Sequence, residues 1–135
     1  MLADACFAVR PVWGWLETRQ RPFLLSELER HNHSDEVFIA ACGRSAMPFA
    51  LGGKLSNPSA QPNPATLSIF IVEPGQAFIV PKGVWHAPAY PLGGAVHYLI
   101  LLEALLPTSD IDTRAVGPFQ FHPVSEDAVM GTKSI

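Results

Sequence analysis

The stretch "GQAFIVPKGVWHAPAY", residues 75–90, contains the pattern that decides the fold. An apolar run leads to Pro81, and Gly83 and His86 follow within five residues. Proline fixes the backbone φ angle, and glycine can adopt the positive φ angle that a tight turn requires. The stretch therefore predicts a strand, a sharp reversal, and a second strand that presents His86 to the interior of a β protein.

A second stretch, "ERHNHSDEVFIAACGR" at residues 29–44, supplies possible partners for that histidine. Side chains two residues apart on a strand point to the same face, so we expect His31 and His33 to converge inside the protein. A bend in the two residues before Glu36 would turn its carboxylate toward them. Imidazoles and a carboxylate are typical ligands of divalent transition metals. The alternative is that these residues are polar positions of an exposed strand, since short motifs often match by chance.

Short apolar runs recur along the 135 residues, and 13 prolines and 10 glycines separate them. This punctuation is typical of an all-β protein, and the length suits a single domain. The predicted strands comprise residues 6–9, 23–28, 36–41, 67–72, 77–80, 95–102 and 119–124.

The proline-rich segment 52–66 has few large apolar side chains and predicts a surface connection between two strand-rich halves. We place the barrel core at about residues 6–103 and a C-terminal extension at 107–135. The last part of that extension, 125–135, is expected to be either loosely ordered or docked on a partner subunit. For residues 97–106 a helix remains an alternative to a strand, because periodicity is ambiguous over so few residues.

Composition excludes several classes of partner. A net charge of −3 provides no basic surface for nucleic acid. The longest apolar stretch, 95–106, is interrupted by His97 and Glu103 and is shorter than the roughly 20 residues of a membrane-spanning helix. The N-terminal residues lack a secretory pattern, and the two cysteines lack disulfide-scaffold or CxxC spacing. We therefore expect a cytoplasmic protein, and the 48% apolar content suggests a homodimer.

The two stretches resemble the two motifs of the cupin superfamily, in the order and approximate spacing of that superfamily. One departure is that only two residues separate His33 from Glu36. The resemblance implies a double-stranded β-helix, or jelly-roll barrel, with the functional site inside. Within the superfamily, residues 28–103 are most similar to ureidoglycolate lyases, formerly called hydrolases. "ERHNHSDEVFIAACGR" looks like their ERH(P)xxSQxFIPL stretch, and "GVWHAP" looks like their GxWHHP stretch.

This similarity implies cleavage of ureidoglycolate to glyoxylate and urea, a step that recovers purine nitrogen through allantoin. The matching residues are Glu29, Arg30, His31, Phe38, Gly83, Trp85, His86 and Pro88. Asp35 and Glu36 replace the family's Ser-Gln pair, and Ala87 replaces its second histidine. Because Glu36 restores the carboxylate of metal-binding cupins, metal binding is favoured and another small, oxygen-rich substrate becomes a competing interpretation.

The predicted chemistry centres on four residues. We expect His31, His33, Glu36 and His86 to bind a divalent transition metal, namely Zn, Fe, Mn or Ni, with no organic cofactor. His31, Glu36 and His86 are also the predicted catalytic residues of a lyase that acts on ureidoglycolate or a similar small hydroxy acid derivative. The alternatives are a non-haem iron dioxygenase or sugar isomerase on the same barrel, and a small-ligand-binding protein without catalysis.

Substrate-binding roles are predicted for Arg44, Lys82, Trp85 and Tyr90. Arg44 offers a bidentate contact to a carboxylate, and Lys82 a charge at the turn, although turn lysines are usually only solvated. Trp85 would shield the site from water, and the Tyr90 hydroxyl would orient the substrate. Strand alternation aims Arg30 away from the site.

Three further positions have structural interpretations. His97 is expected to be a core or interface residue or a supporting partner of the site, and His122 a structural residue. The tryptophans in "VWGWLE", Trp13 and Trp15, predict an edge strand or a subunit interface.

Overall fold

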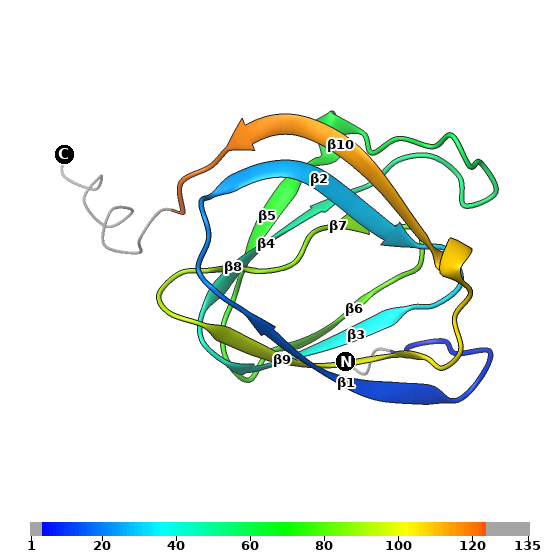
Figure 1. The fold of residues 1–135 in the computed structure, drawn as a ribbon, viewed down its shortest axis with the longest axis horizontal. Helices are drawn as coiled ribbons and strands as arrows, with labels where there is room; N and C mark the ends of the chain where they lie inside the picture. The colour runs from blue at the N-terminus through cyan, green and yellow to red at the C-terminus, as the bar shows by residue number, and fades with distance from the viewer. Residues whose placement is uncertain (1–3, 124–135) are drawn as a thin grey trace, which may run out of the picture.

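Ten strands form two antiparallel sheets that face each other in the computed structural model, which describes residues 4–123 (Figure 1). The smaller sheet contains, in spatial order, β1 (Pro11–Thr18), β9 (Val96–Glu103), β3 (Glu36–Cys42) and β6 (Ala77–Val80). The larger sheet contains, in spatial order, β10 (Ile111–Gln120), β2 (Leu24–His31), β7 (Trp85–His86), β4 (Ser45–Ala50) and β5 (Ser68–Val72), and β8 (Tyr90–Pro91) pairs with β4. The predicted all-β jelly-roll barrel is confirmed.

Most apolar runs form strands close to the predicted positions. The runs at 23–28, 36–41, 67–72, 77–80 and 95–102 correspond to β2, β3, β5, β6 and β9. The predicted strand at 6–9 is wrong, because these residues form an irregular segment before β1. β4 was not predicted, since "SAMPFA" contains a proline and small residues rather than an apolar run. The helical alternative for 97–106 is also wrong, because β9 continues to Glu103 and ends in a turn.

The barrel extends beyond the predicted core boundary at residue 103. Two 3₁₀ turns are present, η1 (Pro64–Thr66) and η2 (Thr108–Asp110), and η2 leads directly into β10. β10 pairs with β2 in a register that places Ile111 opposite His31 and Asp112 opposite Arg30. Part of the segment interpreted as an extension therefore belongs to the larger sheet. Residues 125–135, expected to be loosely ordered or docked on a partner, lie outside the described range.

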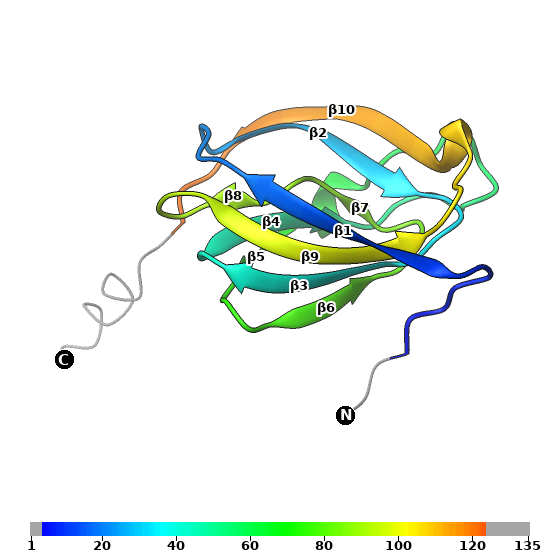
Figure 2. The same cartoon turned by 60° about the horizontal axis from the view of Figure 1, so that its bottom comes forward.

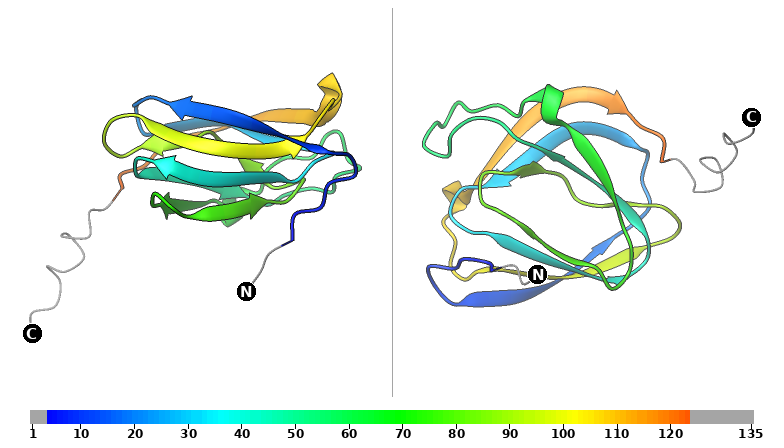
Figure 3. Two further views of the ribbon diagram at one scale, coloured as in Figure 1. Left: turned by 90° about the horizontal axis from the view of Figure 1, so that it is seen from below. Right: turned by 180° about the vertical axis from the view of Figure 1, so that it is seen from behind.

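Two apolar clusters pack on opposite faces of the larger sheet. The cluster between the sheets contains Phe38, Ala40, Met47, Val72, Val80, Ala89, Val96 and Tyr98. The cluster on the outer face contains Leu25, Leu28, Ala50, Ala60, Trp85 and Ala87. Ala60 comes from the connection between β4 and β5, which lies outside the larger sheet beside β2 and β10 (Figure 3). This connection, 52–66, is mostly exposed, as predicted, but it also covers the outer cluster.

The smaller sheet has β1 and β6 at its edges, as Figure 2 shows. On β1, Trp13 and Trp15 are 62% and 64% exposed. Their assignment to an edge strand is confirmed, while the alternative of a subunit contact stays a prediction. Among the described helical segments, none has the length and apolar character needed to cross a membrane.

Candidate metal centre

Three buried side chains meet inside the barrel. Nε2 of His31 lies 3.3 Å from Oε2 of Glu36, and Nε2 of His86 lies 3.4 Å from the same oxygen. The three possible ligand atoms all lie within 4.8 Å of one another. One carboxylate oxygen thus faces two imidazole nitrogens, which is a donor set suited to a divalent metal.

Three strands bring these residues together. β2 ends at His31 and β3 begins at Glu36, so the short link between them carries the chain from the larger sheet to the smaller one. His86 lies on β7, where it pairs with Glu29 of β2 and Phe49 of β4. Gly83 adopts a φ angle of 88°, and its N–H donates to the carbonyl of His31 at 2.8 Å. The predicted reversal before His86 is therefore present, and it is bonded directly to the strand that carries His31.

Hydrogen bonds orient both imidazoles toward Glu36. Nδ1 of His86 lies 3.0 Å from the carbonyl oxygen of Val84, and because a carbonyl only accepts, Nδ1 holds the proton. Nδ1 of His31 lies 2.6 Å from Oδ2 of Asp110, to which it donates in the same way. Each Nε2 then presents a lone pair to the centre, as metal-binding histidines do when their other nitrogen is hydrogen-bonded.

Asp110 also fixes the backbone beside His31. Its Oδ1 accepts hydrogen bonds from the backbone N–H groups of Asn32 at 3.2 Å and His33 at 2.8 Å. The side chain of Asp110 is 2% exposed, and its residue lies in η2, just before β10. One buried carboxylate therefore joins the end of β2 to the start of β10.

The centre is strongly charged when no metal is bound. Burial would raise the pKa of Glu36, but the adjoining imidazoles of His31 and His86 outweigh it and lower this pKa to about 2. Burial would lower the pKa of His31, but Glu36 and Asp110 outweigh it and raise this pKa to about 9. At neutral pH the metal-free centre is thus a carboxylate next to an imidazolium.

The residues present fit a bound cation. Oε2 of Glu36 is buried and accepts no hydrogen bond within the accepted geometry, although buried polar atoms are nearly always paired. A metal between the two Nε2 atoms and this oxygen would satisfy it and would replace the proton on His31. His31, Glu36 and His86 are thus the residues that would hold a metal.

Metal removal is expected to make stability depend on pH. The ordinary pKa of His31 is 6.5 and its folded value is about 9, so its contribution is complete below pH 6.5 and is lost as the pH rises through 9. The contribution of Glu36 is present above pH 4.5 and is lost as the pH falls through about 2. The free energy of unfolding of metal-free protein should therefore be highest between pH 4.5 and 6.5 and fall by on the order of 3 kcal/mol by pH 9.5.

Urea unfolding of metal-free and metal-loaded protein between pH 5 and 9.5 measures this dependence. Metal-loaded protein should lack the alkaline loss, because a metal-bound imidazole is already neutral. A flat profile of the metal-free protein across this range would contradict the charged pair.

The prediction that His33 is a fourth ligand requires correction. Strand alternation no longer applies to His33, because β2 ends at His31 and His33 lies in the following bend. Its side chain is 51% exposed, and its Nδ1 lies 3.0 Å from Oδ1 of Asp110. In the described part of the chain, the structure brings His31, Glu36 and His86 together without His33.

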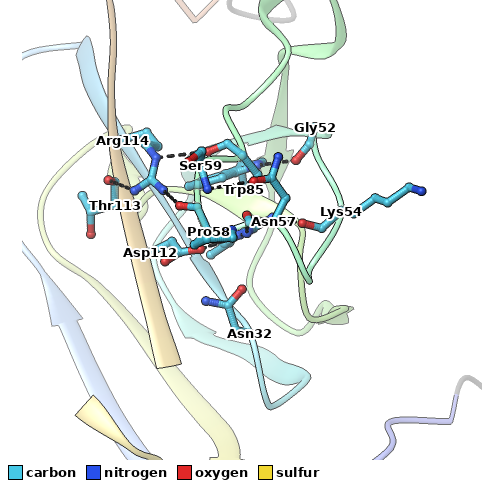
Figure 4. Close-up of polar contacts among 12 residues, drawn as sticks. Asn32, Gly52, Lys54, Asn57, Pro58, Ser59, Trp85, Asp112, Thr113 and Arg114 are labelled. Carbon is cyan, nitrogen blue, oxygen red and sulfur yellow. Dashed lines mark hydrogen bonds and ion pairs between the residues drawn. The ribbon is translucent and has the colours of Figure 1, made fainter. Parts of the chain in front are cut away.

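Trp85 lies on the opposite side of the sheet from the centre, which corrects its predicted role as a shield of the site. It precedes His86 on β7, and adjacent strand residues face opposite ways. Its Nε1 donates to the carbonyl of Gly52 at 2.8 Å (Figure 4). The guanidinium of Arg30 lies 4.8 Å from the ring centroid on the same outer face. The prediction that Arg30 points away from His31 is confirmed.

The other predicted substrate-binding residues also lie apart from the centre. The Tyr90 hydroxyl donates to the carbonyl of Leu24 at 2.9 Å, and its ring lies 3.7 Å below the guanidinium of Arg21. Arg44 precedes β4 at the end far from the His86 pair and forms an ion pair with Glu73 at 2.5 Å. Lys82 is exposed at the turn. The structure does not bring Tyr90, Arg44 or Lys82 to the three ligands.

His97 and His122 are also outside the centre. Nε2 of His97 lies 3.2 Å from Oε2 of Glu17, and its ring stacks on Trp15 at 5.5 Å, so it does not support the metal ligands. His122 is exposed after β10.

Sequence reasoning missed two acidic residues at the centre. Oε1 of Glu29 lies 3.9 Å from Nε2 of His86, and the same alternation that was applied to His33 would have identified Glu29, two residues before His31. Asp110 had no such signal, because it is separated from His31 by 79 positions. The aromatic wall of the centre was missed too: the rings of Phe38 and Phe49 each lie 6.4 Å from that of His86.

Comparison with known proteins gives one family match. The sequence profile of the family described as ureidoglycolate lyase matches residues 9–122. No curated protein shows a significant match to the chain. A solved structure of the 7S globulin of Momordica charantia aligns with 14% identity and a TM-score of 0.49, covering 90% of this chain and 32% of its own. RmlC from Streptococcus suis, solved in complex with dTDP-D-xylose, aligns with 13% identity and a TM-score of 0.47, covering 74% and 47%. The chain thus spans about a third and about half of these two proteins.

Proposed function

Because the chain belongs to the ureidoglycolate lyase family, we propose that it cleaves ureidoglycolate, or a similar small hydroxy acid derivative, to glyoxylate and urea. The observation that carries this proposal is the buried carboxylate of Glu36 between the imidazoles of His31 and His86. These groups offer both proton transfer and metal binding inside a barrel. In an organism that degrades purines through allantoin, this reaction would recover nitrogen as urea.

Cleavage requires one proton to move from oxygen to nitrogen. Ureidoglycolate carries a hydroxyl and a urea nitrogen on the same carbon, so loss of the hydroxyl proton forms the carbonyl of glyoxylate as the carbon–nitrogen bond breaks. The electron pair of that bond goes to the nitrogen, which takes up a proton and leaves as urea. No oxidant, reductant or water is consumed.

Glu29 is the residue that we assign to this proton transfer. Its carboxylate is 35% exposed and lies beside His86, whereas Oε2 of Glu36 is enclosed by the two imidazoles. Glu29 takes the hydroxyl proton and returns it to the departing nitrogen. His31, Glu36 and His86 hold the substrate's oxygen atoms, and a divalent metal bound by them would supply Lewis-acid chemistry that lowers the pKa of the hydroxyl.

A second candidate is favoured by the donor set itself. Two histidines and one carboxylate are the protein ligands of many non-haem iron oxygenases, and Glu36 stands where the resembled lyases have glutamine. The alternative function is therefore a metal-dependent cupin of another class, such as a dioxygenase or a sugar isomerase. Oxygen consumption that requires added Fe(II) would separate a dioxygenase from a lyase, and a non-catalytic binding protein would leave its ligand unchanged.

The protein's partners and location are part of the same proposal. A small-molecule substrate follows from the family, and we place the protein in the cytoplasm as a homodimer. The free thiols of Cys6 and Cys42, both exposed, support a reducing compartment. The exposed indoles of Trp13 and Trp15 support an interface between two copies.

Elemental analysis and a product assay test the proposed function together. Native protein should contain about one transition metal per chain and release glyoxylate and urea in equal amounts from ureidoglycolate. The variant Glu36→Gln should lose more affinity for metal than the roughly 100-fold that loss of a supporting hydrogen bond can cost. Metal-containing protein that leaves ureidoglycolate intact would contradict the lyase, and full turnover of metal-free Glu36→Gln would contradict the role of the metal.

A further inference from the structure

An apolar cavity opens between the two sheets, on the side where β5 and β6 are both edge strands. Its volume is about 530 Å³, within the roughly 300–1,000 Å³ of most small-molecule sites. The main side chains of its wall are Phe49, Phe70, Val72, Phe78, Val80 and Val84. A small organic molecule fits this cavity in size.

The wall of the cavity is aromatic and uncharged. The ring of Phe49 lies 5.8 Å from that of Phe70 and 6.1 Å from that of Phe78. Gln76 is the one residue with a polar side chain among those that line the cavity in the described range, and none of them is charged. Phe70 is 57% exposed, although it faces this space rather than the outer surface of a loop. Such a concave apolar surface is typical of a site for an apolar ligand group.

The cavity shares its wall with the metal centre. Phe49 pairs with His86 across β4 and β7, and Val80 pairs with Glu36 across β6 and β3. The carbonyl of Val84 is the group that orients the imidazole of His86. A molecule that binds the centre through its oxygen atoms can therefore place its other end against the phenylalanine rings.

We propose that the substrate of this chain is amphipathic: a 2-hydroxy acid derivative whose polar end binds at His31, Glu36 and His86 and whose aromatic or branched aliphatic group fills the cavity. The polar half of this proposal rests on the proposed function, while the apolar half rests on the cavity alone. Ureidoglycolate is polar at both ends and would leave the phenylalanine wall uncovered. The inference therefore narrows the substrate to derivatives that carry an apolar substituent.

A matched pair of acids tests the proposal by binding rather than turnover. Glycolate and mandelate share a 2-hydroxy acid end, and mandelate adds a phenyl ring. Calorimetric titration of zinc-loaded protein should show that mandelate binds about 10- to 100-fold more tightly, the factor that corresponds to burial of one aromatic ring. The variant Phe70→Ser should abolish most of this preference and leave the affinity for glycolate unchanged. Trp13→Ser, which removes an equally exposed aromatic ring from β1, is the matched control and should keep the preference.

Benzyl alcohol separates failure of the cavity from failure of the metal centre, because it has the phenyl group without the carboxylate. Even in metal-free protein, it should shift the backbone amide resonances of Ile71 and Ile79, which line the cavity. If these shifts occur and neither acid binds, the assignment of the polar end is overturned while the apolar site stands.

Two results would overturn the apolar site itself. One is equal affinity of native protein for glycolate and mandelate together with no effect of benzyl alcohol. The other is a change from dimer to monomer in Phe70→Ser, measured by light scattering, with the ligand preference unaltered. That result would assign the apolar wall to contact with a second copy of the chain.

Discussion

Replacement of His86 by alanine is expected to lower turnover by about 10²- to 10⁴-fold while the barrel stays folded, because a positioned acid–base group contributes a factor of that size. His86 is 2% exposed, and its Nε2 lies 3.4 Å from Glu36 and 3.9 Å from Glu29. It therefore contacts both carboxylates of the centre. Steady-state rates of glyoxylate release measure the loss, and circular dichroism verifies that the variant is folded.

The matched control is His33→Ala, which removes an imidazole of the same type. His33 also contacts Asp110, but its side chain is half exposed and its ring does not join the ligand atoms. Turnover of this variant should stay within a few-fold of the native rate. Native turnover in His86→Ala, or an equal loss in both variants, would show that the centre is wrongly assigned.

Replacement of Arg30 by alanine is expected to lower the free energy of unfolding by about 3–5 kcal/mol, because it removes one partner of a buried ion pair. The guanidinium is fully buried, and it donates to Oδ2 of Asp112 from Nε at 3.0 Å and from Nη2 at 2.9 Å. It also donates to the carbonyl of Asn57 at 3.1 Å, so it ties the connection after β4 to the outer face of the barrel. The variant leaves Asp112 without this partner and uncovers Trp85. Urea unfolding measures the change.

Arg114 offers a control on the same surface. Figure 4 shows it near Pro58 and Trp85, and its Nε donates to the carbonyl of Ala60 at 3.1 Å. Its guanidinium lies 5.8 Å from the centroid of the Trp85 ring, farther than that of Arg30, and the residue is only partly buried. Arg114→Ala should cost about 1 kcal/mol, the ordinary net value of such hydrogen bonds. Equal losses in Arg30→Ala and Arg114→Ala would mean that burial of the ion pair is not the stabilising factor.

The parts of the centre that follow from local chain geometry could be predicted. The turn before His86 follows from the conformations open to Pro81 and Gly83, and the opposite orientations of Arg30 and His31 follow from strand alternation. The same rule failed at His33 because the strand had already ended, and a sequence does not mark that end to within a residue.

The parts that depend on pairing between distant strands could not be predicted. Asp110 reaches His31 because β10 pairs with β2, and no motif links positions so far apart in the chain. Trp85 was assigned to the site because it adjoins His86, whereas its burial comes from the connection that folds over the outer face. Contacts of this kind follow from the topology of the sheets rather than from any short stretch of sequence.

The carboxylate that joins η2 to the end of β2 has a consequence for the order in which the protein matures. During synthesis from the N-terminus, His31, Glu36 and His86 all emerge from the ribosome before Asp110. Until Asp110 arrives, His31 lacks the partner that fixes its tautomer and the orientation of its ring. Pairing of the last strand and completion of the metal-binding centre are thus one event, so a nascent chain that still lacks β10 holds its three ligands in an unfinished geometry.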